Sequence, residues 1–251
     1  MFRTNYFYID EAGTLGNDSK IFIHGCIKTD NSVIIEKALL ELRKTLIEDL
    51  YFEGFIERIK QEGFHAVENH HDIKTQFYRL LPFLDYRAYF VILDKTTPFY
   101  TQLKQKKNDY EIFEYTLTKL LSDRIVKNKT DKNIFYFERI NIEKKALSVI
   151  LKDFFSSLDS SYDCEYHIVG KEEENLAVVD YLNYMFFQIL EDLKNKKVKK
   201  NLEFDRMMLN FNLVKSKIGL INIVHSDTFL SRKKKFEKRI EYDNLIKEFG
   251  G

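Results

Sequence analysis

Residues 5–16 read NYFYIDEAGTLG, and this stretch decides the fold. The run from Tyr6 to Ile9 contains only large apolar and aromatic residues, which is typical of a buried strand. It leads directly into two adjacent carboxylates, Asp10 and Glu11, although an ionised carboxylate is costly to bury. A buried strand that ends in charge therefore needs a partner that neutralises the charge.

The apolar pattern of the whole chain predicts an α/β fold. Strands are expected at residues 5–9, 21–28, 86–94, 133–138 and 163–169. Helices are expected at residues 33–50, 70–81, 109–127, about 142–158 and 174–193. A turn rich in Gly, Asn, Asp and Ser joins the first two strands into a hairpin, and Asn31 or Ser32 is the expected cap of the first helix. This order predicts a mixed sheet that helices cover on its faces.

Composition places the chain among globular proteins. Hydrophobic residues make up 44% of the 251 residues and charged residues 31%, a balance that disordered chains lack. No apolar run approaches the roughly 18–20 residues that span a bilayer, and the first residues lack a secretory signal, so we expect a cytoplasmic protein without membrane contact. Two cysteines, Cys26 and Cys164, support neither a disulfide framework nor a cysteine zinc site.

The net charge of +1 is unevenly distributed along the chain. Residues 194–251 contain 15 Lys and Arg against 7 Asp and Glu, whereas residues 1–193 carry a net charge of −7. We expect an acidic catalytic domain over residues 1–193 and a basic extension over residues 194–251 that packs on the same domain. An AT-biased genome would also encode such a lysine-rich composition.

The lysines of the basic stretches are candidate contacts to the phosphates of a nucleic acid. They are Lys196, Lys197, Lys199 and Lys200 in the first stretch and Lys233, Lys234 and Lys235 in the second. The alternative is a solvated linker and a solvated helix face. No base-reading motif accompanies these lysines, so no sequence preference is predicted.

Three carboxylates follow or interrupt sequence that should be buried. Asp10 follows the first strand, Glu138 ends the strand at 133–138, and Asp180 lies among apolar residues of the helix at 174–193. Carboxylates that converge repel one another unless a divalent cation neutralises them, and hard oxygen ligands suit Mg²⁺ or Mn²⁺. Two such ions can stabilise the attacking and the leaving oxygen when a phosphodiester is hydrolysed.

Each of these carboxylates also has an ordinary structural explanation. Asp10 can cap backbone N–H groups in a turn, and Glu138 can pair with the adjacent Arg139. Asp180 can form a buried hydrogen bond or ion pair.

Three features of the sequence together resemble a bacterial protein family, the domain of unknown function 3800. They are YIDEAG after an aromatic run, a second strand that contains Gly25, and the late helix sequence NLAVVDY at residues 175–181. The resemblance covers roughly residues 5–190. It implies a ribonuclease H-like fold, with a mixed five-stranded sheet in which the first two or three strands are antiparallel and the later ones parallel. It also implies a metal-dependent nuclease, found in families of this kind near mobile-element or phage-defence genes.

The resemblance carries over to individual residues only where the motifs match. Asp10 and Glu11 stand where the family has its Asp-Glu pair, and Asp180 stands where the family has the Asp of its late helix. Glu138 occupies a position where the family more often has Asp, and Holliday-junction resolvases of the wider fold use Glu at a similar place. Ala12 stands in place of the usual Ser, and AVVD replaces the family's LQLAD. In such a sheet the first and fourth strands are neighbours, so Asp10 and Glu138 would face the same metal ion.

A histidine-rich segment, GFHAVENHHD at residues 63–72, offers a further candidate. The family has a histidine in this region, so His65 is the expected one, as a general acid, a water-orienting group or a phosphate contact. The alternative is a polar turn that opens a helix. Further on, Lys171 is a candidate phosphate contact, and Glu173 and Glu174 either approach the cluster or only complement the dipole of the following helix.

The sequence therefore predicts a divalent-metal-dependent nuclease that acts on DNA or RNA in phage defence or a mobile-element context. The predicted metal ligands are Asp10, Glu138 and Asp180, and Glu11 and His65 are accessory catalytic groups. The alternative is a noncatalytic subunit that binds nucleic acid or a protein partner in a defence or toxin-like system. A phosphohydrolase with another substrate is a third possibility.

Overall fold

The computed structural model describes residues 3–142, 145–170, 172–196, 201–232 and 238–250. Its strands are β1 (Thr4–Ala12), β2 (Ile21–Thr29), β3 (Arg87–Asp94), β4 (Lys132–Glu138), β5 (Asn141–Ile142), β6 (Lys145–Ala146), β7 (Cys164–Val169), β8 (Ile218–Ile223) and β9 (Thr228–Ser231). Its α-helices are α1 (Ser32–Glu48), α2 (Ile56–Glu62), α3 (His71–Leu80), α4 (Pro98–Lys106), α5 (Asp109–Lys127), α6 (Leu147–Ser156), α7 (Leu176–Lys194), α8 (Leu202–Val214) and α9 (Tyr242–Phe249). Short 3₁₀ turns occur at Leu50–Phe55, Leu81–Phe83, Lys215–Lys217 and Val224–Ser226.

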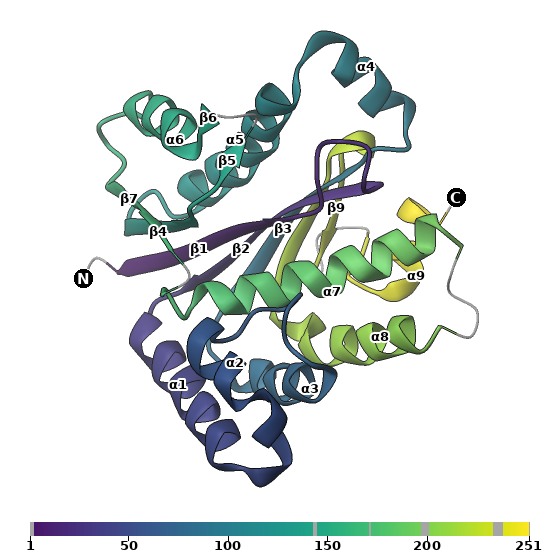
Figure 1. The fold of residues 1–251 in the computed structure, drawn as a ribbon. Helices are drawn as coiled ribbons and strands as arrows, with labels where there is room; N and C mark the ends of the chain where they lie inside the picture. The colour runs from purple at the N-terminus through teal and green to yellow at the C-terminus, as the bar shows by residue number, and fades with distance from the viewer. Residues whose placement is uncertain (1–2, 143–144, 171, 197–200, 233–237, 251) are drawn as a thin grey trace.

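A mixed sheet of seven strands forms the centre of the molecule, in the order β7-β4-β1-β2-β3-β8-β9 (Figure 1). β1, β2 and β3 are antiparallel neighbours, whereas β4 is parallel to β1 and β7 is parallel to β4. The predicted α/β class and the five predicted strands are confirmed. The sheet is larger than predicted by two strands, because β8 pairs with β3 and β9 pairs with β8.

Alternation along β1 divides the core into two layers. Phe7 and Ile9 pack with α5 and α6 on one face, and Tyr8 packs with α1, α3, α7 and α8 on the other. Figure 1 shows these two groups of helices on opposite sides of the sheet. Because both faces are covered, β1 is apolar at nearly every position before Asp10, as expected for a central strand.

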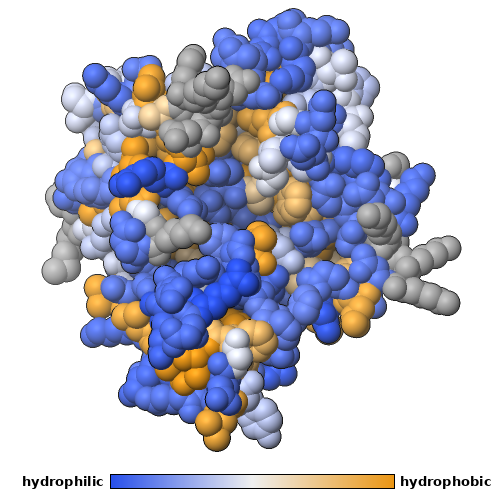
Figure 2. Space-filling model, in the orientation of Figure 1, coloured by the Kyte–Doolittle hydropathy of each residue, from blue (hydrophilic) through white to orange (hydrophobic). Residues whose placement is uncertain are grey.

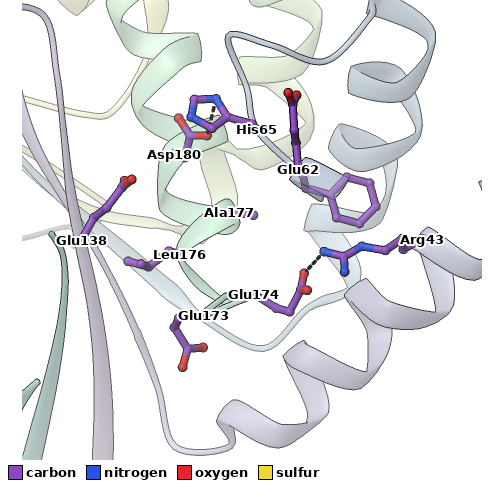
Figure 3. A pocket seen from close by; sticks show the side chains of 10 residues that line it. Arg43, Glu62, His65, Glu138, Glu173, Glu174, Leu176, Ala177 and Asp180 are labelled. Atoms are coloured by element: carbon purple, nitrogen blue, oxygen red, sulfur yellow. Dashed lines mark hydrogen bonds and ion pairs between the residues drawn. The ribbon is translucent and has the colours of Figure 1, made fainter. Parts of the chain in front are cut away.

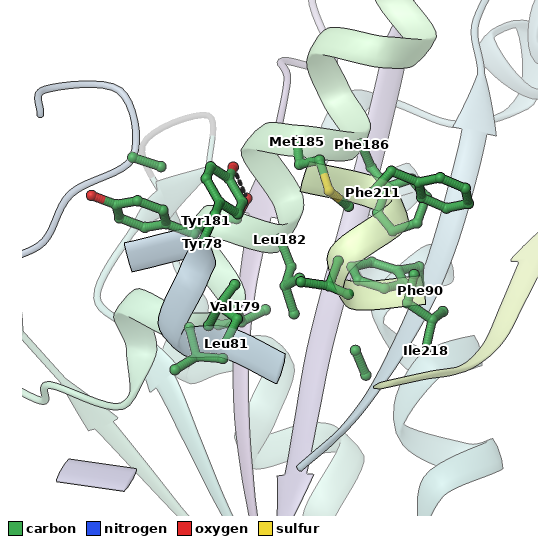
Figure 4. Close-up of a cluster of buried hydrophobic side chains, with 14 of the residues drawn as sticks. Tyr78, Leu81, Phe90, Val179, Tyr181, Leu182, Met185, Phe186, Phe211 and Ile218 are labelled. Carbon is green, nitrogen blue, oxygen red and sulfur yellow. Dashed lines mark hydrogen bonds between the residues drawn. The ribbon is translucent and has the colours of Figure 1, made fainter. Parts of the chain in front are cut away.

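α7 is the most buried helix and packs against β1 and β2. Its apolar side chains, among them Tyr181, Leu182, Met185 and Phe186, contact the sheet and α8 in the core (Figure 4). The hydroxyl of Tyr78 on α3 donates a hydrogen bond to the backbone carbonyl of Tyr181 at 2.7 Å. The prediction that the segment 174–193 is a buried helix is confirmed, with bounds of Leu176–Lys194.

Other element bounds differ from the predicted ones. The expected helix at 142–158 begins only at Leu147, because the residues before it form the small β5–β6 hairpin. The sequence predicted no helix at the positions of α2 and α4, and both helices are short. Asn31 caps α1 as predicted, since its side chain accepts a hydrogen bond from the N–H of Ile34.

The face of the molecule in Figure 2 is mostly hydrophilic, with scattered hydrophobic patches. Single exposed apolar side chains of this kind are normal for a folded protein. Among the described helices, none combines the length and the apolar character needed to cross a membrane.

Candidate functional site

Asp10 lies inside β1, not at its end. Pairing with β4 stops at Ile9, but pairing with β2 continues to Ala12, so the strand runs three residues beyond the predicted end. The Asp10 side chain is only 7% exposed, and its Oδ2 accepts one long hydrogen bond, from Asn183 Nδ2 at 3.4 Å. Burial and the nearby carboxylates of Glu11, Asp180 and Glu138 raise the pKa of Asp10 well above its usual range.

Glu138 reaches the same region from the neighbouring strand. Tyr8 and Tyr136 are register partners on β1 and β4, and their rings stack at 5.0 Å. Asp10 and Glu138 each follow two residues later, so they lie on the same face of the sheet. The predicted pairing of the first and fourth strands is confirmed. The alternative considered for Glu138 was an ion pair with Arg139. Among the described residues, these two form no ion pair.

Asp180 lies in the second turn of α7 and is partly buried. Its Oδ2 accepts a hydrogen bond from the backbone N–H of Ala66 at 2.8 Å and lies 3.7 Å from Nδ1 of His65. Asp180 therefore anchors the loop at residues 63–70 while it remains beside the sheet carboxylates. The alternative considered for Asp180 was a buried hydrogen bond, and its Oδ2 makes such a bond with the N–H of Ala66. Asp180 nevertheless belongs to the acidic cluster, because it contributes to the raised pKa of Asp10.

The loop that carries His65 is held in place by Asn69, which is 4% exposed. Asn69 Oδ1 accepts from the N–H of His65 at 2.9 Å and from the hydroxyl of Tyr181 at 2.5 Å, and Nδ2 donates to the carbonyl of Gly63 at 3.3 Å. The buried Nδ1 of His65 has no hydrogen bond among the described residues. Asn69 thus holds the backbone at His65, and the imidazole faces Asp180 (Figure 3).

Glu11 alternates to the opposite face of β1 from Asp10, and its side chain is partly exposed. Burial, Glu138 and Asp180 raise the pKa of Glu11 to about 7, against the opposing effect of its own backbone hydrogen bond. The structure therefore places Glu11 within electrostatic reach of the cluster, although its side chain leaves the strand in another direction.

A pocket with about 410 Å³ of empty space, part of it open to solvent, joins three of the predicted residues. Glu138, Asp180 and His65 line it (Figure 3). Arg43 and Glu62 also line the pocket, although the sequence did not predict them there. Glu173 and Glu174, for which the sequence allowed either an approach to the cluster or a purely structural role, line it as well.

Arg43 on α1 pairs with Glu174, and the guanidinium lies 5.8 Å from the ring centre of Phe64. Its Nε is buried and has no hydrogen bond among the described residues. A signal for Arg43 was present in the sequence, because it lies four residues after the buried Leu39 and three before the buried Leu46. A cation on the apolar stripe of a helix is the same kind of contradiction that identified Asp180.

The carboxylates fit a hard divalent cation by their chemistry. Asp10, Glu138 and Asp180 are oxygen donors on two strands and a helix, and burial together with Asp180 and Glu138 raises the cost of ionising Asp10, a cost that a cation would lower. In the part of the chain that the structure describes, no three acidic, His or Cys side chains already stand at metal-ligand spacing.

The basic residues predicted to contact nucleic acid are mostly outside the described residues. These are Lys171, Lys197, Lys199, Lys200, Lys233, Lys234 and Lys235. Lys196 is among the described residues and is exposed. Its backbone is in the left-handed conformation with φ 56°, just after the C-terminal end of α7. At 1.5 Å per residue this end lies about 20 Å along the helix from Asp180, so Lys196 does not belong to the pocket.

No family model matches this chain, and no curated protein matches it either. The resemblance to the domain of unknown function 3800 therefore stays a prediction, and the function is argued from the site.

Proposed function

We propose that this protein is a divalent-metal-dependent nuclease with a ribonuclease H-like fold. The observation that carries the proposal is the convergence of carboxylates from β1, β4 and α7, which together with burial raise the pKa of Asp10 and of its neighbour Glu11. Such a cluster needs a proton or a cation to offset the repulsion of its charges, and a divalent cation is the partner that a nuclease would use. The strand order β7-β4-β1-β2-β3, antiparallel on one side of β1 and parallel on the other, is consistent with the proposed fold.

Asp10 and the residues that line the pocket have separate chemical roles in this proposal. Bound divalent ions would supply a Lewis acid that activates water and stabilises the leaving oxygen of a phosphodiester. Asp10, Glu138 and Asp180 are the ligands in this proposal. His65 lines the pocket with an imidazole that can hold or transfer a proton, and its Nδ1 lies 3.7 Å from Oδ2 of Asp180. Arg43 places a cation in the wall of an otherwise acidic pocket, where it can face a phosphate oxygen.

A panel of labelled nucleic acids tests the proposal. Single-stranded and duplex DNA, RNA and a DNA–RNA hybrid are incubated with the protein in Mg²⁺, in Mn²⁺ and in EDTA. We expect cleavage of at least one substrate with metal and none in EDTA. Asp10→Asn should lower the cleavage rate by at least about a hundredfold, since it replaces a charged ligand with a neutral one.

The matched control is Asp243→Asn, which makes the same change at an exposed position on α9. It should cleave at the parent rate, and circular dichroism should show both variants folded. Parent-like cleavage by Asp10→Asn would remove the proposed metal site. Absence of cleavage under every condition, together with binding that EDTA does not change, would favour the noncatalytic binding subunit.

A further inference from the structure

A second groove lies between α3 and α8, and neither the carboxylate cluster nor the basic stretches account for it. The two helices are in contact and lie side by side in Figure 1. The groove has about 990 Å³ of empty space, part of it open to solvent. We call it the α3–α8 groove; the residues that define it are His71, Lys74 and Arg79 on α3 and Arg206, Leu209 and Leu213 on α8.

Its charge is one-sided. Among the described residues that line the α3–α8 groove there is no Asp or Glu, whereas Lys74, Arg79 and Arg206 each contribute a cation. The carboxylate of Glu203 lies 3.7 Å from Arg206 and 3.6 Å from His71, and it accepts a hydrogen bond from the hydroxyl of Tyr184 at 3.5 Å. Arg79 is exposed and has no ion-pair partner among the described residues.

Lys74 is a buried cation in the wall of the groove, and the nearby carboxylates of Glu203, Asp180 and Glu68 interact with its charge without an ion pair to it. Its side chain is only 6% exposed, and its Nζ donates to the hydroxyl of Tyr184 at 3.2 Å and lies 4.2 Å from the centre of that ring. In the described part of the chain no carboxylate lies within ion-pair distance of Lys74. Lysine is rarely buried unless a counter-ion accompanies it, and a phosphate could reach it through the open groove.

Lys74 also connects the groove to the carboxylate cluster. Tyr184, its hydrogen-bond partner, follows Asp180 by one turn on α7, a rise of about 6 Å along the helix axis. An extended polyanion with one phosphate at the carboxylates could therefore place a neighbouring phosphate near Lys74. This step rests on the proposed nuclease function.

The walls of the groove suit exposed bases. Leu209 is 67% exposed and Leu213 is 44% exposed, and both line the groove together with the amides of Asn210 and Asn212. A single strand presents bases that can pack on apolar side chains and phosphates that can pair with a cationic rim, whereas a duplex hides its bases.

From this arrangement we propose that the α3–α8 groove binds a single-stranded segment of the nucleic acid, with a backbone phosphate at Lys74 and bases against Leu209 and Leu213. The groove thus directs the strand away from the carboxylate cluster along α3.

Fluorescence anisotropy tests this inference without any cleavage. A fluorescein-labelled single strand of about 20 nucleotides is titrated with the full-length protein in EDTA, at several salt concentrations. Arg79→Glu should weaken binding at least about tenfold and lower the magnitude of the salt slope by about 0.7 or more, since one phosphate contact is lost. Leu209→Asp should weaken binding by a similar factor through the apolar wall.

Lys74→Met removes the buried charge and keeps most of the apolar stem, and it should weaken binding about fivefold or more. The matched control is Lys152→Glu on α6, an exposed charge reversal on the opposite face of the sheet, which should bind like the parent. If Arg79→Glu and Leu209→Asp bind the strand like the parent, the inference is wrong, whether or not the protein cleaves nucleic acid.

The two proposals fail separately. Cleavage that is lost in Asp10→Asn, with strand binding and cleavage unchanged in the groove variants, would support the nuclease function and contradict the proposed binding in the groove. Binding that depends on the groove, in a protein that cleaves nothing, would remove the nuclease. A labelled glutamate-rich peptide that binds through Arg79 and Leu209, while the oligonucleotide does not bind, would replace the nucleic acid by an acidic protein partner.

Discussion

Asp10 and Glu11 are consecutive residues that point to opposite faces of β1, yet Glu11 adds to the effect of burial in raising the pKa of Asp10. Asp10 is enclosed beneath α7, where Asn183 is its one side-chain hydrogen-bond donor among the described residues. The Glu11 residue is partly exposed, and burial and the carboxylate of Glu138 raise its pKa to about 7. The metal-free protein therefore carries an electrostatic cost that depends on pH.

Replacement of Glu11 by Gln should remove part of this cost. The pKa of Glu11 is about 7 in the folded protein and about 4.5 in the unfolded chain, so the folded state holds the proton more tightly. The corresponding stability is present below pH 4.5 and is lost as the pH rises through about 7. In EDTA, Glu11→Gln should therefore be more stable than the parent by about 1–3 kcal/mol at pH 8, and this gain should shrink at pH 5.

Urea unfolding at both pH values measures the difference. Glu41→Gln, an exposed change on α1, is the control and should show no such dependence on pH. A gain for Glu11→Gln that is equal at pH 5 and pH 8 would mean that the carboxylates do not interact as described.

At the residue scale, a charged side chain on the apolar face of a helix is an informative feature of the sequence. Asp180 was identified because a carboxylate stood on an apolar helix, and the structure places it in the pocket with His65 and Glu138. Arg43 satisfied the same criterion and was missed. Asn69 and Asn183 could not have been found in this way, because asparagine is common on surfaces and only the packed structure shows that both are buried.

At the scale of elements, the site depends on how closely α7 approaches β2. Gly25 is the register partner of Asp10, and a Cβ atom at this position would lie 1.9 Å from Oδ1 of Asn183. The missing side chain thus makes room for the amide that donates to Asp10. The resemblance included a glycine in the second strand, but only the pairing of β1, β2 and α7 gives the physical reason for it.

Gly25→Ala should therefore displace Asn183 and loosen α7 from the sheet. We expect a loss of about 1–3 kcal/mol in the free energy of unfolding, the usual cost of overpacking. In the double variant with Asn183→Ala, most of the additional cost of Gly25→Ala should disappear, because the clashing amide is gone.

Chemical denaturation of the four variants in this cycle gives the coupling energy. Gly54→Ala is the matched control, since a Cβ there would meet no atom within 4 Å. Equal costs of Gly25→Ala with and without Asn183 would show that this contact does not set the position of α7.

Element prediction succeeded where the periodic pattern was long and failed where it was short. β1, β2, α5 and α7 have long apolar or amphipathic runs, and each was predicted within a few residues of its observed bounds. β5 and β6 have two residues each, and α2 has seven, so they leave almost no periodic signal. β8 has an apolar run but pairs with β3, about 130 residues earlier, and no local pattern contains that information.

At the scale of the molecule, the basic extension is partly neutralised within the structure. Lys194 pairs with the fully buried Asp94, Lys215 pairs with Glu241 at 3.0 Å, and Lys238 pairs with Glu248. The excess of +8 over residues 194–251 already includes Glu241 and Glu248, so only the pair of Lys194 with Asp94 lowers this charge further. Lys74 and Arg79, the two cations on which the proposed strand-binding groove depends, lie in the first part of the chain.

The extension has a structural role that its charge does not reveal. β8 and β9 continue the central sheet beyond β3, and Phe211, Leu245 and Phe249 are buried in the same core as α7. Removal of residues 196–251 would expose the edge of β3 and the apolar side of α7, and an exposed edge strand with an apolar face promotes aggregation. We therefore expect the fragment 1–195 to lack a cooperative thermal transition and to elute as aggregates in size-exclusion chromatography.

A point substitution separates loss of the sheet from loss of chain length. Ile221 on β8 is fully buried, so Ile221→Asp in the full-length protein should also abolish the cooperative transition, since it places an unpaired charge in the core. Phe229→Asp on β9 is the contrasting variant, because this side chain is 37% exposed and the protein should tolerate the charge. If the fragment 1–195 unfolds cooperatively and gains stability on addition of Mn²⁺, the carboxylate site needs only the first five strands, and the extension is an addition to a complete domain.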